Sequence, residues 1–276
     1  MDRKRRLEDD RVDDRTRRKH KKKYHRGRRK KASIGGIIST IILIVAVCVF
    51  CYSAFQLVQI QSGYKKGENE YDEIEEKAVS IDTEEDRYRV DFDTLRELNP
   101  DVVAWIRFDE PSVINYPVVQ GKDNEEYLHK TFKGYDNTVG TIFVNVDNHP
   151  DFNDRNTIIY GHYMYNGTMF NDLEDYLDKE FWEKYPCFYI YTPDGAEIKY
   201  HIYAAGVVKD TSEGYTYQFA DDAAFQSFLD TTKASGDYDT GVELDLSSQV
   251  VTLSTCTKSN NNDRMVIHAV KTGVRQ

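Results

Sequence analysis

The sequence predicts a mainly β protein, an eight-stranded closed β-barrel with several peripheral α-helices, preceded by one transmembrane helix. Three observations predict this fold class. Residues 34–58 carry no charged side chain, and the later chain contains eight short runs rich in β-branched and aromatic residues. Gly, Pro, Asn and Asp clusters separate those runs, as turns separate strands. Eight strands are enough to close a barrel.

The first predicted element is the apolar run over residues 34–58. About 20 helical residues cross the hydrocarbon core of a bilayer, so this run is long enough to span it. Residues 1–31 hold 17 Lys and Arg against 6 Asp and Glu, whereas the rest of the chain holds 20 against 41. Basic flanks stay on the cytoplasmic side. We therefore expect a single-pass protein of the cell membrane, with a basic cytoplasmic tail over residues 1–33 and the C-terminal domain extracellular.

Other interpretations of this N-terminal end fit less well. A cleaved signal peptide has an apolar core of about 7 to 15 residues, shorter than this run. Cys48 and Cys51 lack the small preceding residue that lipidation favours, and they are interpreted as membrane-embedded apolar residues. Nothing aromatic or groove-fitting accompanies the basic charge, so we expect the tail to contact anionic lipid and not nucleic acid.

Residues 59–90 are rich in Glu and Asp with little apolar periodicity, which predicts a solvated stalk or linker, or a frayed helix. The extracellular domain is expected over residues 91–276, a length of about 185 residues that is ample for one core. It opens with a short helix capped by Asp91 or Asp93 and ended by Asn99-Pro100.

Strands and helices then alternate along this domain. The eight strands are expected at residues 102–108, 112–119, 140–145, 157–162, 187–192, 197–208, 249–256 and 264–272. Helices are expected at residues 124–129, 169–176, 179–184 and 221–233. The turn sequence Thr192-Pro193-Asp194-Gly195 makes a hairpin of the strands on either side.

The candidate site combines residues at the ends of predicted strands. The run that ends on Cys256 is followed eight residues later by Arg264, which opens the returning strand, so both residues are expected at the same end of two neighbouring strands. His162 ends another strand-like run just before a loop rich in Gly and Asn. A thiol, an imidazole and a guanidinium together point to acyl transfer. Taken singly, a free Cys is more often an inert apolar residue and a lone His a structural hydrogen-bonding group.

Other reactive side chains are assigned structural roles. Cys187 opens an apolar alternation and is expected to be a buried strand residue, which leaves Cys256 as a free thiol. His201 and His268 fall within strands, while His129 and His149 are unassigned. Three carboxylates that invite comparison with a calcium site lack the spacing of a calcium-binding loop. They are Asp147, Asp151 and Asp154. No metal and no cofactor is expected.

The residues around the thiol, Thr-Leu-Ser-Thr-Cys with a downstream Arg, resemble the signature of the sortases, the cysteine transpeptidases of Gram-positive cell surfaces, whose motif is Thr-Leu-x-Thr-Cys. The similarity extends over about residues 91–272 and is closest to class B. It is carried by residues 105–106, 114–120, 123–124, 127–128, 140–143, 160–162, 169–170 and 173, and by the long segment 211–235, where class B enzymes carry a helix. The cytoplasmic tail is longer and more basic than usual, and residues 258–263 form a very polar loop.

The resemblance implies a sortase-type barrel and a set of roles. Cys256 would attack the threonine carbonyl of a C-terminal sorting signal on a surface protein and form a thioacyl intermediate. His162 would protonate the departing amine and later deprotonate the incoming amine of a peptidoglycan precursor or cross-bridge. Arg264 would stabilise the oxyanion or hold the substrate backbone. Ser254 and Thr255 flank the thiol and would line the substrate pocket, although a plain strand role has equal weight.

Three alternatives stay open at this point. A sortase of this class could polymerise pilins and not anchor proteins to the cell wall. A cysteine protease or hydrolase would use the same pair of residues and let water complete the reaction. A noncatalytic, membrane-anchored binding domain would leave Cys256 incidental.

Overall fold

The structure is a computed structural model of the whole chain, and it describes residues 34–82, 87–257 and 262–276. The chain divides into two units, Met1–Phe55 and Gln56–Gln276. Within the first unit the described residues all belong to the helix α1 (Ile34–Ala78), which continues into the second. The basic tail expected over residues 1–33 lies outside the described residues, as do residues 258–261 of the polar loop.

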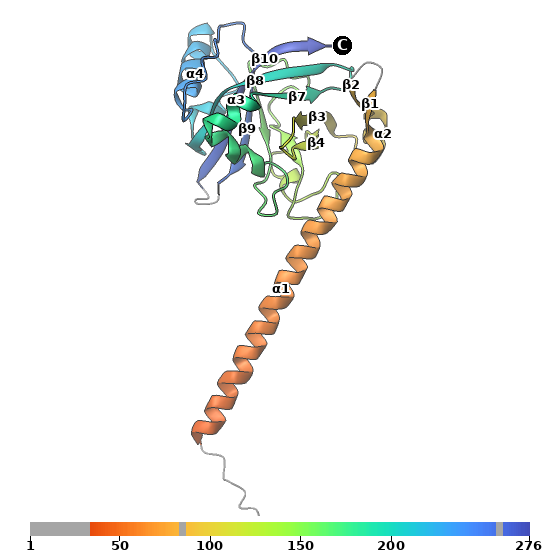
Figure 1. Cartoon of the computed structure of the whole chain (residues 1–276), viewed down its shortest axis with the longest axis vertical. Coiled ribbons are helices and arrows are strands. Elements are labelled where there is room, and N and C mark those ends of the chain that lie inside the picture. Colours follow the sequence, from red (N-terminus) through yellow and green to blue (C-terminus); the bar gives the residue numbers. More distant parts are fainter. Residues whose placement is uncertain (1–33, 83–86, 258–261) are drawn as a thin grey trace, which may run out of the picture. The chain divides into compact units, whose positions relative to one another are not determined.

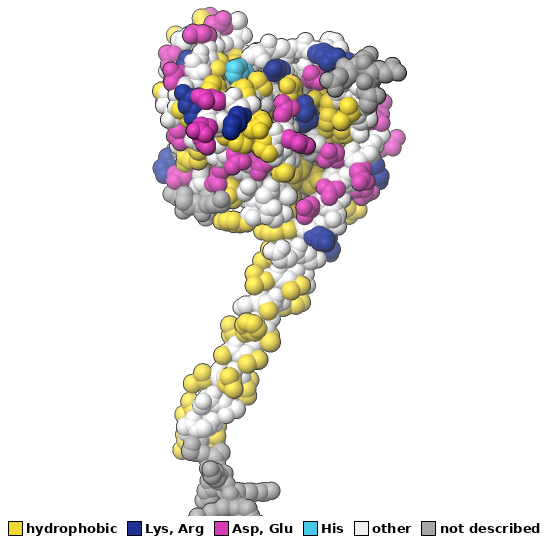
Figure 2. All heavy atoms as spheres, viewed as in Figure 1, with side chains coloured by type: hydrophobic (Ala, Val, Ile, Leu, Met, Phe, Trp, Pro, Cys, Tyr) yellow, Lys and Arg dark blue, Asp and Glu magenta, His cyan; other side chains and the backbone are white. Residues whose placement is uncertain are grey.

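The N-terminal part of α1 is apolar and exposed. Its most apolar 18-residue window has a mean hydropathy of 2.8, and none of that window is buried within the structure. Figure 2 shows hydrophobic side chains covering this part of the helix. Buried helices of soluble proteins pass the same test of length and composition, but an exposed one would be costly in water. Length, composition and exposure are therefore consistent with the membrane helix expected over residues 34–58.

A closed barrel of eight strands forms the body of the second unit, as predicted (Figure 1). Around the barrel the strands follow the order β10-β8-β7-β3-β4-β5-β6-β9. The strands are β3 (Val102–Phe108), β4 (Asn115–Val119), β5 (Ile142–Val144), β6 (Asn156–Tyr160), β7 (Cys187–Tyr191), β8 (Glu197–Lys209), β9 (Val250–Cys256) and β10 (Asp263–Arg275). Each matches one predicted run. The main core contains buried side chains from both faces of these strands, among them the fully buried Trp105, Ile106 and Leu253.

Helical segments lie around the barrel. The expected helix after Asp91 is α2 (Phe92–Leu98), and the Asp91 carboxylate caps it by accepting from the Asp93 and Thr94 amides, both at 3.0 Å. The helices α3 (Lys179–Lys184) and α4 (Asp222–Ala234) also match their predictions. The segments expected at residues 124–129 and 169–176 form 3₁₀ turns, η2 (Glu126–Leu128) and η3 (Asn171–Leu177), and a third such turn is η4 (Glu213–Tyr215).

The segment 59–90 was expected to be a solvated stalk or a frayed helix, and the structure shows a helix with one buried face, followed by a hairpin. Residues up to Ala78 continue α1, and a hairpin of β1 (Val79–Asp82) and β2 (Arg87–Val90) follows. The buried residues of α1 recur every three or four positions, so they lie on one helical face that packs against the domain. They are Gly67, Tyr71, Ile74 and Ala78. Acidic residues occupy the rest of the helix surface, and they hid this periodicity in the sequence.

Candidate active site

The candidate site forms where β9 ends between two neighbours. On one side β9 pairs with antiparallel β10, and Arg264 lies directly opposite Cys256. On the other side it pairs with parallel β6, and Tyr160 lies opposite Ser254. The pairing continues one step beyond β6, since the Gly161 amide donates to the Ser254 carbonyl at 3.1 Å. His162 follows Tyr160 by two residues, as Cys256 follows Ser254. Strand pairing therefore brings the three predicted residues to one end of the barrel.

Cys256 is the last residue of β9 and the only exposed residue of that strand. The six residues before it in the strand are buried, whereas Cys256 is exposed and forms no disulfide. The expectation of a free thiol is confirmed. A thiol that ends a buried strand is accessible to substrate, yet its backbone is held by β10 directly and by β6 up to Ser254.

His162 is half-buried and held by the backbone of another loop. Its Nε2 lies 2.6 Å from the Leu128 carbonyl oxygen. A carbonyl can only accept, so Nε2 carries the proton and the lone pair of the neutral ring is on Nδ1. Burial lowers the pKa of His162 below its ordinary value of 6.5, with a smaller contribution in the same direction from nearby His129, and the hydrogen bond to Leu128 opposes both. His129 stacks on His162 with ring centroids 6.4 Å apart.

Arg264 shares a strand face with Cys256, because directly paired residues project to the same side of a sheet. Its side chain is 25% exposed. One guanidinium nitrogen donates to the Asp263 carbonyl at 3.1 Å, and another lies 4.0 Å from an Asp210 carboxylate oxygen. These contacts orient the guanidinium of the residue that pairs with Cys256.

Tyr215, on η4, belongs to the same face and was not predicted from sequence. Its hydroxyl lies 2.7 Å from the Ser254 hydroxyl, and its ring stacks on Tyr160 with centroids 6.4 Å apart. Burial raises the pKa of Tyr215 to about 12, so it is a neutral hydrogen-bonding group, and the charge of Arg264 is near enough to oppose that rise. No local motif marks Tyr215, because the fold of a long connection places it here.

The two residues expected to line the pocket fall on opposite faces of β9. Ser254 alternates with Cys256 and so shares its face, and its hydroxyl is paired with Tyr215. Thr255 alternates with Val251 and Leu253, which belong to the main core. Its buried Oγ1 has no hydrogen-bond partner among the residues that the structure describes.

The residues assigned structural roles are accounted for within the fold. His268 is buried and its Nδ1 lies 2.9 Å from the Thr252 hydroxyl, while burial lowers its pKa to about 3. Cys187 opens β7 as predicted but is half-buried, and burial raises the pKa of its thiol.

The three carboxylates considered for calcium are instead engaged in local hydrogen bonds. Asp154 accepts from the His149 amide at 2.7 Å, Asp151 accepts from the Asn153 amide at 3.1 Å, and Asp147 accepts from the Tyr217 hydroxyl at 2.9 Å. That no metal is required stays a prediction.

A closed eight-stranded barrel with an exposed thiol, an imidazole and a guanidinium at the ends of neighbouring strands defines the class, a cysteine acyl-transfer enzyme. Comparison with known proteins supports it. The sortase domain model matches residues 108–272. Sortase B of Staphylococcus aureus is 32% identical over 235 residues, covering 83% of this chain and 95% of that protein. Sortase B of Listeria monocytogenes is 36% identical over 177 residues, covering 63% and 70%.

Solved structures agree with this relationship. Sortase B of Bacillus anthracis, solved in complex with AAEK1, matches with a TM-score of 0.67 and 31% identity, covering 77% of this chain and 99% of that one. A Staphylococcus aureus sortase B–substrate complex matches at 0.62 and 27%, covering 80% and 97%. A sortase B complexed with triglycine matches at 0.61 and 32%, covering 67% and 86%. The chain belongs to class B of the sortase family, the sortase-type cysteine transpeptidases.

Proposed function

We propose that this transpeptidase cleaves a threonine-containing C-terminal sorting signal of surface proteins and transfers the new acyl end to an amine of a peptidoglycan precursor or cross-bridge. Cys256 is the proposed nucleophile, His162 the general acid and base, and Arg264 the group that stabilises the oxyanion. The observation that carries this assignment is the strand pairing that sets Arg264 opposite Cys256 and continues β6 toward His162.

In the first half-reaction the Cys256 thiol transfers its proton to Nδ1 of His162, and the resulting thiolate sulfur attacks the threonine carbonyl carbon. A carbon–sulfur bond forms and the negative charge moves to the carbonyl oxygen, where the Arg264 guanidinium can donate two hydrogen bonds. The intermediate collapses with cleavage of the carbon–nitrogen bond, and the departing amine takes a proton from His162. A thioester on Cys256 and a free amine result.

In the second half-reaction an incoming amine attacks the thioester. His162 accepts the proton that this amine loses, the carbon–sulfur bond breaks, and Cys256 regains its thiolate. Since Nε2 of His162 donates to Leu128, Nδ1 is the atom proposed to exchange the proton in both steps. Burial favours the neutral ring, and neutrality is what a base for an amine requires.

The face around the thiol supports a peptide substrate. Ser254 lies on the strand face of Cys256, its buried hydroxyl is bonded to that of Tyr215, and the Tyr215 ring stacks on Tyr160. We propose that Ser254 contacts the substrate through its side chain. Thr255, buried on the other face, contributes by fixing the backbone that carries Cys256. The substrate and triglycine complexes of related sortases B support a sorting signal and a peptide amine as the two substrates.

The proposed location is the cell membrane, with the N-terminus cytoplasmic and the catalytic domain extracellular. The apolar run of α1 and the basic residues before it support this orientation. Protease added to intact cell bodies should degrade the chain beyond about residue 65 and leave the tail protected. A C-terminal domain that stays protected until the cells are opened would contradict the orientation.

The function is tested with the full chain in detergent micelles, a panel of threonine-containing pentapeptides and triglycine as acceptor. Mass spectrometry should find a thioester on Cys256 and a ligated product whose yield rises with triglycine. Cys256→Ala is the negative control, and Cys187→Ala is the matched control for the other extracellular thiol. Hydrolysed product alone, independent of triglycine, would favour a protease. A Cys256 that does not react with a thiol reagent would favour a binding domain.

A further inference from the structure

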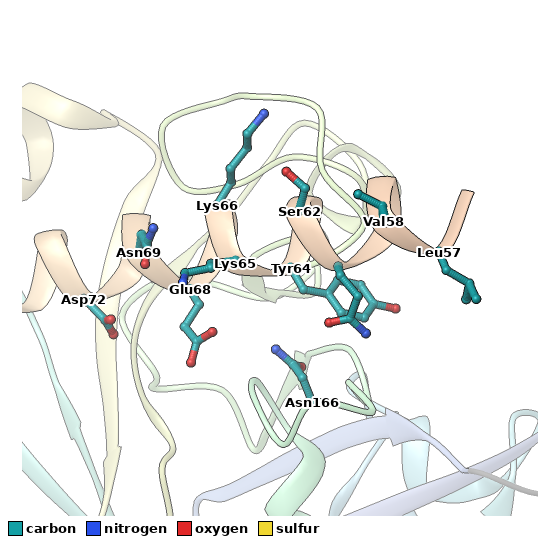
Figure 3. A pocket seen from close by; sticks show the side chains of 11 residues that line it. Leu57, Val58, Ser62, Tyr64, Lys65, Lys66, Glu68, Asn69, Asp72 and Asn166 are labelled. Carbon is teal, nitrogen blue, oxygen red and sulfur yellow. The ribbon is translucent and has the colours of Figure 1, made fainter. Parts of the chain in front are cut away.

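A groove of about 950 Å³ separates α1 from the loop that follows His162. We call residues 163–168 the post-histidine loop. On the α1 side the groove is lined by residues that begin at Leu57 and Val58, and on the loop side by Asn166. Figure 3 shows Glu68 and Asn166 facing one another across the groove, with Lys66 directed away from it.

The post-histidine loop has a defined shape. Its ends are joined by a bridge between Tyr163 and Met169, and the Gly167 amide donates to the Met164 carbonyl at 3.0 Å. Gly167 has φ of +85°, a conformation that favours glycine. This turn places Tyr165 at the tip with 74% of its surface exposed. A large aromatic side chain is thus held in solvent by a closed loop.

The groove lies at the level where α1 leaves the proposed membrane span. The apolar run ends at Val58, and the first basic side chains after it are Lys65 and Lys66, about 10 Å further along the helix. Tyrosine and lysine are the residues that mark the interface between hydrocarbon and water. Tyr64 also lines the groove. A loop residue that shares a groove with Val58 therefore lies near the bilayer surface.

We propose that the post-histidine loop contacts the interfacial layer of the bilayer that holds α1, with Tyr165 as the inserted side chain. The proposal rests on the membrane anchoring proposed above. It gives the domain a second membrane contact besides its helix. Because the loop starts immediately after His162, this contact fixes the height of the catalytic end of the barrel above the membrane. A substrate whose sorting signal is itself tethered to the membrane would meet the site at that height.

The test is depth-dependent fluorescence quenching on the full chain in vesicles of phosphatidylcholine and phosphatidylglycerol. Tryptophan replaces Tyr165, Val58 or Val274 in separate variants, and the signal of the native Trp105 and Trp182 is subtracted. Lipids that carry a nitroxide near the headgroup serve as quenchers. We expect added quenching at positions 165 and 58 and none at position 274.

Val274 is a suitable control because it lies at the other end of the domain. It lines a cavity with Thr192 and Pro193. Arg87, which follows the C-terminal end of α1, donates to the Gly195 carbonyl of the same turn at 3.2 Å. That end of α1 lies about 30 Å along the helix from Val58. Quenching at 58 without quenching at 165 overturns the proposal. Loss of quenching at both overturns the anchoring and the proposal together.

A second variant connects the contact to catalysis. Tyr165→Glu places a charge where an anionic interface repels it, so turnover of a peptide tethered to the same vesicle should fall. Turnover of a soluble peptide should stay at the parent level, since Tyr165 is not part of the proposed catalytic machinery. Val274→Glu is the matched control and should change neither rate. Equal losses on both substrates would overturn the proposal in favour of a local effect on His162.

Discussion

Two parts of the molecule position the proposed catalytic residues, and they are held by different forces. The thiol and the guanidinium are fixed by backbone ladders, since β9 pairs with a strand on each side. The segment that supports His162 through the Leu128 carbonyl is instead braced by side chains of α1. The backbone hydrogen bonds of paired strands persist when most side chains are replaced. Support that consists of side-chain contacts is weakened whenever one of those side chains is replaced. The comparison therefore predicts that a substitution on α1 disturbs the position of His162 more than the position of the Cys256 thiol.

The brace consists of specific contacts between α1 and residues 128–141. The Tyr71 hydroxyl donates to the Gly140 carbonyl at 2.6 Å, and the Lys133 amide donates to Glu70 at 2.9 Å. The Asn137 side chain donates to the Gly63 carbonyl at 3.0 Å. Gly140 itself lies against His162, because a Cβ built on it would approach the imidazole Cδ2 to 2.8 Å. One hydroxyl on the helix is thus two contacts away from the proposed base.

The largest expected effect is the loss of activity when Cys256 or His162 is replaced. Cys256→Ala and His162→Ala should each abolish transpeptidation, because Cys256 is the proposed nucleophile and His162 the proposed proton carrier. Neither residue is a major packing element, so the unfolding midpoint in urea should change little. Turnover with a pentapeptide and triglycine measures the first effect.

Cys187→Ala is the contrasting variant. The half-buried thiol packs at the start of β7, so its loss should lower the free energy of unfolding by about 1 kcal/mol and leave turnover unchanged. A folded Cys187→Ala protein without activity, beside an active Cys256→Ala protein, would reverse the assignment of the nucleophile.

The next effect distinguishes charge from geometry at Arg264. Arg264→Lys keeps the cation but loses the planar fork, so kcat should fall by about 10²-fold if two donors must meet the oxyanion. If the cation only favours the thiolate, most of the activity should remain. Turnover of the variant, measured beside the pH dependence of thiol alkylation, decides between the two roles.

The positions of Cys256 and Arg264, which strand pairing holds, were predictable from sequence. The side-chain contacts between α1 and residues 128–141 were not. Strand ends follow from local β-rich runs, so the sequence alone places Cys256 and Arg264 at the same end of two neighbouring strands and His162 at the end of a third, whose parallel pairing with β9 only the structure shows. The buried face of α1 repeats at helical spacing, but acidic residues between its members made the segment look like a solvated linker. Tyr215 could not be predicted because its position depends on how the whole connection between β8 and β9 folds.

A smaller effect tests the brace directly. Tyr71→Phe keeps the buried ring but removes the donor to Gly140, so the free energy of unfolding should fall by about 1 to 3 kcal/mol. Turnover should fall as well, while alkylation of Cys256 at neutral pH should be unchanged, since the ladder holds the thiol. The exposed Tyr135→Phe is the matched control and should change neither quantity. Equal loss of thiol reactivity and turnover in Tyr71→Phe would contradict the separation of the two parts.

The smallest effect concerns the electrostatics of the histidine. His129 is exposed, and its charge contributes to lowering the pKa of His162. His129→Gln removes that repulsion of the imidazolium, so the pKa of His162 should rise toward its ordinary value of 6.5 without reaching it, because burial is the larger cause and remains. An NMR titration of the His162 ring measures the shift, and the acid limb of kcat/KM should move to higher pH in parallel. A pKa that falls in His129→Gln would show that His129 supports the ring through packing, and the stacked geometry would then outweigh the charge.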